Sequence, residues 1–179
     1  MSDQFRTSRL TLRPWDPDSD DDVTTAFDIY RPDEVARWLG ARPAPWSSVD
    51  AARERLRRWQ RAPQDHPGYG LWAVVPDSVG TPVGTVLLVH LRGSDDVDTT
   101  DVEVGWHFHP EHWGHGYATE AASRLLDHAF TDLGLDTVNA VAYPGNERST
   151  AVMQRLGMRS RGETDRWYGA TLEWWSVER

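Results

Sequence analysis

The alternation of apolar and polar residues is most regular between Val102 and His109. On one side of this segment lie Val102, Val104, Trp106 and Phe108, and on the other lie Glu103, Gly105, His107 and His109. A period of two is typical of a β-strand with one buried face. The pattern therefore predicts a strand over these residues.

A different period begins at Ala118. Apolar residues recur there at three- and four-residue spacing, at Ala118, Ala121, Ala122, Leu125, Leu126, Ala129, Phe130 and Leu133. Glu120, Arg124 and Asp127 fall on the opposite side. This spacing predicts an amphipathic helix that packs its apolar face against the rest of the fold.

The turn between this strand and this helix carries two glycines, Gly114 and Gly116, in the run from Trp113 to Tyr117. The first N–H groups of a helix have no partner within the helix, and the helix dipole is positive at that end. Glycine also lets a ligand approach the backbone closely. The turn is therefore a candidate site for an anion such as a phosphate.

The rest of the chain alternates between strand-like and helix-like segments. The expected strands are Leu10 to Trp15, Leu71 to Val75, Val83 to Val89, Val138 to Val141, Met158 to Glu163 and Trp167 to Val177, the last with a bend or bulge at Gly169. The expected helices are Val23 to Tyr30, capped by the acidic run Asp16 to Asp22, then Pro32 to Leu39, Val49 to Arg61 and Ser149 to Arg155. Gly40 to Ser48 and Arg92 to Thr100 are expected as loops, and Pro63 to Gly70 is expected to end a helix.

Composition narrows the possible functions. The 179 residues suit one domain, 1–179. The chain has no cysteine, which excludes disulfides, thiolate metal sites and a cysteine acyl-enzyme. A net charge of −9 disfavours nucleic acid and anionic membranes as partners and favours a cationic amine. Without a basic and apolar leader at Met1 or an apolar run of membrane-spanning length, the protein is expected to be soluble and cytoplasmic.

Three interpretations of the glycine turn compete. The first is an ordinary connection from strand to helix, with glycines for tight geometry. As a dinucleotide motif it matches the first two glycines of G-x-G-x-x-G, but Thr119 stands at the third, and Asp136 precedes the next apolar run instead of following it. The third interpretation is a cradle for the diphosphate of acetyl-coenzyme A, and the sequence after the helix favours it.

Three motifs in order carry a resemblance to a known family. They are the strand VEVGWHFHP, the turn WGHGYATEA that opens a helix, and a strand that ends near Asn146 before a short helix closing on RLGM at Arg155 to Met158. In these motifs the chain resembles the GNAT acyltransferases, and within them the RimJ/RimL-like branch. A weaker resemblance begins at Ser8 to Pro14. In the family pattern Arg/Gln-x-x-Gly-x-Gly/Ala, Trp113 departs from the first position.

The resemblance implies an α/β (α+β) GNAT fold, with a mixed, mostly antiparallel sheet flanked by helices. It also implies direct transfer of an acetyl group from acetyl-coenzyme A to an amine through a ternary complex, without a metal. A backbone N–H near Trp106 to Phe108 would then polarise the thioester carbonyl. The cofactor-binding residues that it implies are Trp106, His107, Phe108, Trp113, Gly114, His115, Gly116, Tyr117, Ala118, Asn146 and Ser149.

The attacking amine must lose a proton, and three groups share the polar side of the predicted strand: Glu103, His107 and His109. Glu103 is the first candidate for the base because a carboxylate also attracts an ammonium ion. The structural alternative is a half-exposed carboxylate paired with an arginine. The histidines at 107, 109, 112 and 115 do not indicate a metal site, because no carboxylate or cysteine completes a recognisable ligand motif.

Many family members protonate the departing thiolate with a tyrosine seven residues after the asparagine that matches Asn146. That position is Met153 here, which cannot donate a proton. RimL-like members place a serine three residues after the asparagine, and Ser149 occupies that position. The resemblance therefore assigns Ser149 to the thiolate and Asn146 to the pantetheine amides. Both residue types also cap helices, which is the alternative for each.

The acceptor remains open between a protein N-terminus and a small-molecule amine. The segments expected to face it, Tyr30 to Ser48 and the region around Trp167 and Tyr168, contain Trp38 and Trp46. These aromatic residues suit either a substrate wall or packing in the core or a homodimer. An alternative function is a coenzyme A-binding sensor or interaction module without catalysis.

Overall fold

The computed structural model describes residues 4–40 and 43–179, with the backbone alone for residues 62–65. The strands are β1 (Phe5–Arg6), β2 (Leu10–Pro14), β3 (Gly70–Pro76), β4 (Gly84–Arg92), β5 (Asp98–Phe108), β6 (Thr137–Ala142), β7 (Arg159–Thr164) and β8 (Leu172–Glu178). The helices are α1 (Asp20–Tyr30), α2 (Asp33–Ala36), α3 (Val49–Asp65), α4 (Tyr117–Thr131) and α5 (Glu147–Arg155), with a short 3₁₀ helix, η1, at Pro110–His112.

All eight strands form a single sheet in the order β1-β2-β3-β4-β5-β6-β8-β7. Neighbouring strands are antiparallel except β5 and β6, which run parallel. A parallel pair needs a crossover connection, and here α4 supplies it. The expected mixed, mostly antiparallel sheet with flanking helices is therefore confirmed.

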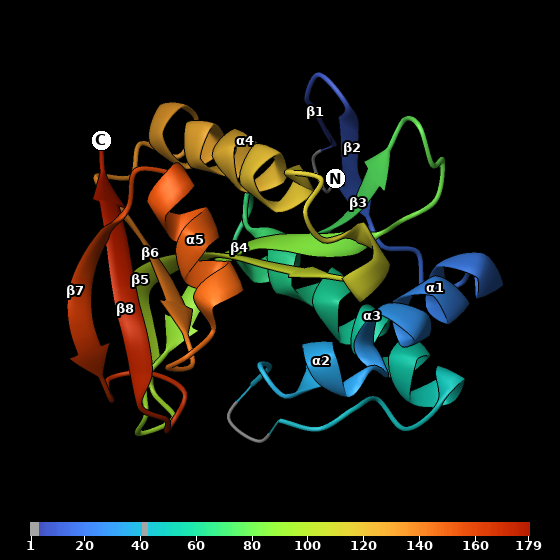
Figure 1. Cartoon of the computed structure of the whole chain (residues 1–179), viewed down its shortest axis with the longest axis horizontal. Coiled ribbons are helices and arrows are strands. Elements are labelled where there is room, and N and C mark those ends of the chain that lie inside the picture. The colour runs from blue at the N-terminus through green and yellow to red at the C-terminus, as the bar shows by residue number, and fades with distance from the viewer. Residues whose placement is uncertain (1–3, 41–42) are drawn as a thin grey trace.

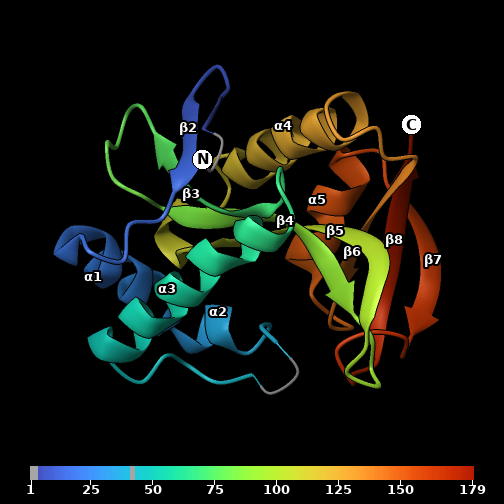
Figure 2. The same ribbon diagram turned by 180° about the vertical axis from the view of Figure 1, so that it is seen from behind.

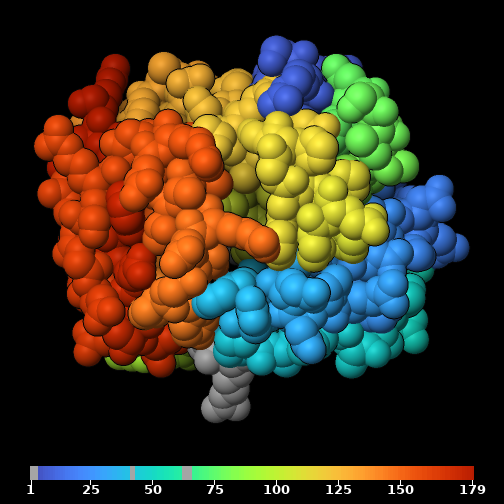
Figure 3. Space-filling view, viewed as in Figure 1, coloured from blue at the N-terminus to red at the C-terminus, as the bar shows by residue number. Residues whose placement is uncertain are grey.

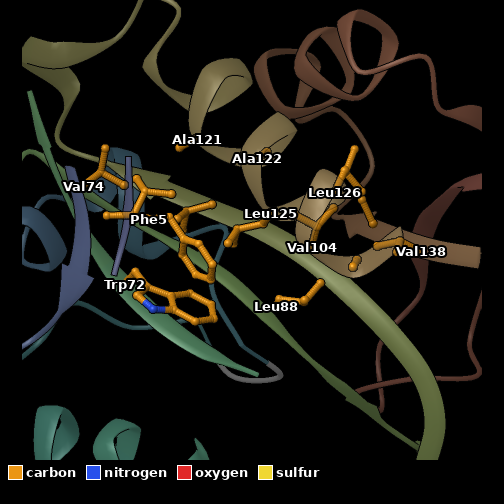
Figure 4. Close-up of a cluster of buried hydrophobic side chains, with 14 of the residues drawn as sticks. Phe5, Trp72, Val74, Leu88, Val104, Ala121, Ala122, Leu125, Leu126 and Val138 are labelled. Atoms are coloured by element: carbon orange, nitrogen blue, oxygen red, sulfur yellow. The ribbon is translucent and has the colours of Figure 1, made fainter. Parts of the chain in front are cut away.

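The helices cover the two faces of the sheet. Figure 1 shows α4 and α5 on one face, and Figure 2, from behind, shows α3 in front of the other. The main core lies beneath α4, where Leu125 is fully buried among Phe5, Leu88 and Val104 (Figure 4). Burying a leucine of this kind stabilises the fold by roughly 1.5–3 kcal/mol. The helical spacing predicted from Ala118 onward is thus confirmed, because Ala121, Ala122, Leu125, Leu126 and Ala129 are buried, and Ala118, Phe130 and Leu133 pack, partly buried, against the same core.

A second core forms between α1, α3 and the other sheet face, around Trp15, Tyr30 and Leu56. Here the acidic run before Val23 has the capping role expected of it. The Ser19 hydroxyl accepts a hydrogen bond from the Asp22 N–H, and Asp20 to Asp22 form the first turn of α1. The Asp22 carboxylate is buried and receives both guanidinium nitrogens of Arg13, at 2.6 and 2.7 Å. Among the described residues, no helix is long and apolar enough to cross a membrane.

Several predicted boundaries were wrong. Helix α3 continues through Pro63 to Asp65, because a proline near a helix end removes only one hydrogen bond of the last turns. Strand β5 begins at Asp98, inside the segment expected as a loop. The expected strand from Trp167 is a loop until β8 starts at Leu172, since Tyr168 and Gly169 both have positive φ, which a strand does not allow. Residues 41 and 42 of the expected loop Gly40 to Ser48 lie outside the described residues.

Candidate active site

The site begins where the two parallel strands diverge. The register between β5 and β6 contains the pair Glu103 with Asn139, whereas the register between β5 and β4 continues as far as Phe108. The last residues of β5 therefore have a sheet partner on one edge and an open edge on the other.

Backbone alternation decides which N–H groups face the open edge. Just after β5, the His109 N–H donates to the Val83 carbonyl on the β4 side. Successive residues of a strand direct their N–H groups to opposite edges. The N–H groups of Trp106 and Phe108 therefore point away from β4, toward the edge that β6 leaves open. The Phe108 carbonyl on that edge accepts a hydrogen bond of 2.8 Å from the Trp113 indole.

The turn before α4 presents further unpaired amides. Gly116 is the N-cap of α4 with φ 79° and ψ 3°, and no side chain caps the helix. Gly114 has φ 82° and open space around the position of an added Cβ. Both conformations are left-handed, which explains the choice of glycine at each. The first turn of α4 thus keeps free N–H groups and the positive end of its dipole, as an anion site requires.

A cluster of hydrogen bonds holds this turn in place. The Glu120 carboxylate accepts hydrogen bonds from the Thr7 hydroxyl at 2.6 Å and from the Arg9 guanidinium at 2.7 Å. Arg9 also donates to the His115 carbonyl at 3.2 Å. Burial tends to raise the pKa of Glu120, but these hydrogen bonds outweigh it and lower the pKa. The start of the chain therefore fixes the turn whose amides face outward.

A cavity of about 480 Å³ lies between the open edge of β5, the start of α4, α5 and α2. Figure 3 shows the surface hollowed between α5 and the segment that leads into α4, with α2 beside it. A volume in this range is typical of a small-molecule site. Arg148 and Arg155 line it together with a single carboxylate, Glu34, so its charged lining is net positive despite the acidic chain.

Most residues that the resemblance assigned to cofactor binding meet in this cavity. Its lining includes Trp106, His107, Phe108, Trp113, Gly114, Gly116, Tyr117, Ala118, Asn146 and Ser149. His115 is outside the lining; its ring stacks on Tyr117 with 5.4 Å between ring centroids. Glu103 is also outside the lining. The structure therefore brings the cofactor residues together and places the candidate base apart from them.

Asn146 and Ser149 occupy the first turn of α5 with different surroundings. Asn146 caps the helix, because its Oδ1 accepts a hydrogen bond of 3.3 Å from the Ser149 N–H. The Asn146 amide NH₂ has no hydrogen-bond partner among the described residues, and Asn146 lines the cavity. The Ser149 hydroxyl has no hydrogen-bond partner among the described residues and lines the cavity. Met153, at the position of the family tyrosine, is buried in the core beneath α4.

Glu103 is buried, with 9% of its surface exposed. Its carboxylate accepts a hydrogen bond of 2.6 Å from the Tyr168 hydroxyl, and no arginine pairs with it among the described residues. Burial raises the pKa of Glu103 to about 7, although the hydrogen bond from Tyr168 opposes the rise. The half-exposed carboxylate paired with an arginine is therefore not what the structure contains.

Sequence reasoning missed Tyr168 as a partner of Glu103. Its backbone has φ 59°, which is uncommon for a residue other than glycine. Burial raises its pKa, and so does the adjacent Glu103. Trp167 beside it is buried and donates to Asp101 at 3.2 Å, so this tryptophan belongs to the core. The local sequence around Tyr168 contains no signal for a contact with β5.

His107 belongs to a second network that was also missed. Its Nδ1 lies 3.1 Å from the Tyr30 hydroxyl, and that hydroxyl donates to the Thr85 Oγ1 at 2.7 Å. The Trp15 indole donates to the same Thr85 oxygen at 3.2 Å. Burial lowers the pKa of His107 to about 4, so its ring is neutral at neutral pH. Tyr30 is itself buried, which raises its pKa.

The aromatic residues of the expected acceptor segment have separate roles. Trp46 is buried and stacks on Tyr30 with 4.3 Å between centroids, so it is part of the core. Trp38 lines the cavity with Val35 and Leu39. On the opposite wall the Arg148 guanidinium lies 4.2 Å from the centroid of the Trp113 ring.

In the part of the chain that the structure describes, no group of three or more histidine or acidic side chains could hold a metal ion.

Comparison with known proteins agrees with this geometry. A model of the acetyltransferase (GNAT) domain matches residues 9–159. The uncharacterized N-acetyltransferase YoaA of Bacillus subtilis is 27% identical over 88% of this chain and 84% of its own length. The FsC-acetyl coenzyme A-N(2)-transacetylase of Aspergillus fumigatus is 34% identical over 51% of this chain and 40% of its own length.

Solved structures share the fold. The ribosomal-protein-S5-alanine acetyltransferase of Vibrio fischeri is 19% identical with a TM-score of 0.73, and the match covers 99% of this chain and 97% of that one. At this identity the likeness concerns the fold alone. The family model spans most of the chain, including β5, the glycine turn and α5. The chain therefore belongs to the GNAT family of N-acetyltransferases.

Proposed function

We propose that this protein, as a member of the RimJ/RimL-like branch, transfers an acetyl group from acetyl-coenzyme A directly to a primary amine. The observation that carries the proposal is the set of unpaired amides in the turn from Gly114 to Ala118, whose residues other than His115 line the cavity at the edge of β5. Two backbone donors and a helix N-terminus suit a long ligand with an acyl carbonyl at one end and a diphosphate at the other.

Acetyl-coenzyme A, when bound, supplies the acetyl group as a thioester. The amides of the turn would hold its diphosphate. Arg148, whose guanidinium lies over the Trp113 ring, adds positive charge at the same wall of the cavity. The N–H groups of Trp106 and Phe108 would donate to the acyl carbonyl oxygen. The Asn146 amide NH₂ would hold the pantetheine arm, and the Ser149 hydroxyl would donate to the sulfur as it leaves.

Glu103 remains the proposed base. A pKa of about 7 leaves a large fraction of this carboxylate ionised at neutral pH and still makes it a useful proton acceptor. Because Glu103 lies outside the cavity lining, the proton would reach it through an intervening hydrogen-bonded group or water. Turnover should accordingly rise with pH through about 7 and lose this dependence in Glu103→Gln.

Calorimetric titration with acetyl-coenzyme A tests the proposal, with coenzyme A and NAD as comparison ligands. We expect saturable binding of both coenzyme A species and none of NAD. A screen of amines, including peptides with free N-termini, would then follow the release of free thiol. Absence of acetyl-coenzyme A binding by folded protein would reject the proposal.

A matched pair of glycine variants locates the binding site. Gly116→Glu places a negative charge where the diphosphate is expected, and Gly134→Glu introduces the same side chain at another left-handed glycine with open space around it. Both variants bear similar backbone strain. We expect only Gly116→Glu to abolish binding. Equal affinity in the two variants would move the ligand away from this turn.

A further inference from the structure

The start of α4 carries a negative charge of its own. Glu120 is the acidic residue in the first turn of this helix, whose N-cap is Gly116. A carboxylate at a helix N-terminus competes with an anionic ligand for the positive end of the dipole. Burial tends to raise the pKa of Glu120, but the hydrogen bonds to its oxygens lower it below the ordinary value, so the carboxylate is ionised at neutral pH. A diphosphate on the glycine turn would therefore meet a like charge nearby unless another group compensates it.

The compensating group comes from the turn between β1 and β2, which lies beside the start of α4 (Figure 1). The Arg9 guanidinium places its Nε 2.7 Å and its Nη2 2.6 Å from the Glu120 Oε2. The Glu120 Oε1 accepts hydrogen bonds from the Arg9 N–H at 3.0 Å and from the hydroxyls of Thr7 and Ser8 at 2.6 and 3.1 Å. Both carboxylate oxygens are thus engaged by three consecutive residues, and the pair of Arg9 and Glu120 carries no net charge.

Arg9 also contacts the turn that presents the amides. Its Nη1 donates to the His115 carbonyl at 3.2 Å, and its guanidinium carbon lies 5.2 Å from the centroid of the Tyr117 ring. Its Nη2 is 3.5 Å from the position that a Cβ would occupy on Gly116. Arg9 therefore reaches three consecutive residues of the turn, although it lies outside the lining of the cavity.

We propose that Arg9 is a positioning residue for the diphosphate of acetyl-coenzyme A, because it cancels the charge of Glu120 and holds the backbone of the glycine turn. This inference rests on the proposed acetyl transfer. Without Arg9, the ionised Glu120 would act on the diphosphate as an uncompensated like charge. Without the charge of Glu120, Arg9 would add a positive charge that the ion pair now cancels. The side chain of Glu120 is only 17% exposed, so water screens its charge incompletely.

The ion pair can be broken from either side, and the two changes should have opposite effects on affinity. Arg9→Ala should weaken acetyl-coenzyme A binding by about tenfold, because Glu120 keeps its charge. Glu120→Gln should strengthen binding by about threefold, because Arg9 keeps its charge. The double variant should return to within about threefold of the wild type. A role limited to fastening the turn predicts weaker binding in all three variants.

Calorimetric titration with acetyl-coenzyme A at low and high salt measures these effects. Arg6→Ala is the matched control, because Arg6 belongs to the same hairpin, its loss removes the same charge, and its ion pair with Asp77, at 3.4 Å, is exposed. We expect unchanged affinity in this control. The loss in Arg9→Ala should shrink at high salt, since salt screens the repulsion between Glu120 and the ligand.

Weaker binding in Glu120→Gln, or unchanged binding in Arg9→Ala, would overturn the proposal. A double variant that binds as weakly as Arg9→Ala would overturn it as well. If circular dichroism shows that Arg9→Ala does not fold, Glu120→Gln decides the question, because this change removes the charge and leaves no carboxylate unpaired. Failure of the wild type to bind acetyl-coenzyme A would instead remove the acetyl transfer itself.

Discussion

Replacing Glu103 by glutamine should make the protein more stable at alkaline pH while it abolishes the pH-dependent step of turnover. Burial raises the pKa of this carboxyl from its ordinary value of 4.5 to about 7 in the folded protein. The folded state therefore holds the proton more tightly than the unfolded state does. Ionisation of Glu103 at high pH consequently destabilises the fold.

The magnitude follows from the two pKa values. The difference of about 2.5 pH units, at about 1.36 kcal/mol per unit, corresponds to roughly 3 kcal/mol. Below pH 4.5 both states carry the proton, and this stability is fully present. It is lost as pH rises through about 7, beyond which both states are ionised. Glutamine cannot ionise, and its amide oxygen can still accept the hydrogen bond from Tyr168.

Urea unfolding of wild type and Glu103→Gln between pH 4 and pH 9 measures the effect. A glutamine NH₂ group without a hydrogen-bond partner lowers the free energy of unfolding by the same amount at every pH. The informative quantity is therefore how the difference in unfolding free energy between the variant and the wild type changes with pH. That difference should grow by about 3 kcal/mol in favour of the variant. Glu54→Gln, on the exposed side of α3, serves as the control. If the difference in unfolding free energy between the variant and the wild type does not change from pH 4 to pH 9, burial does not raise the pKa of Glu103 to about 7.

Three further changes test separate parts of the structure. Ser149→Ala should lower kcat about tenfold or more with little change in acetyl-coenzyme A affinity, because the proposed role of the hydroxyl is to donate to the leaving sulfur. Steady-state kinetics at saturation that show only weaker binding would assign it to affinity. Arg148→Ala should weaken acetyl-coenzyme A binding about threefold to tenfold, measured by calorimetry, with a loss that shrinks at high salt. Leu125→Ala should cost about 2–5 kcal/mol of unfolding free energy in urea, since Leu125 is fully buried; a cost below 1 kcal/mol would contradict the packing beneath α4.

The elements with strong periodicity were predictable. The alternation from Val102 to Phe108 and the spacing from Ala118 to Ala129 correspond to β5 and α4, because each segment packs one face on a large core. Strand β1 was missed because two residues, Phe5 and Arg6, are too few to show a period. The tail from Trp167 was misassigned because its aromatic residues resemble a strand, while its backbone turns through positive φ.

The cavity was predictable in part, and for a physical reason. Its backbone donors depend on glycine placement and helix termini, which local sequence encodes at Gly114 and Gly116. The partners of its side chains do not follow from local sequence. Tyr30 reaches His107 across 77 positions of the chain, and Tyr168 reaches Glu103 across 65. Contacts of such separation depend on how the sheet brings distant segments together.

The sequence by itself thus determined the family, the turn that offers its amides to an anion, and the strand whose polar side carries the candidate groups. Only the tertiary structure decided which of those groups reach the cavity and how they ionise. Burial of Glu103 beneath Tyr168 raises one pKa, and burial of His107 against Tyr30 lowers another, although both residues lie on the same side of β5. Desolvation is a property of the packed surroundings, so no pattern along the chain contains it.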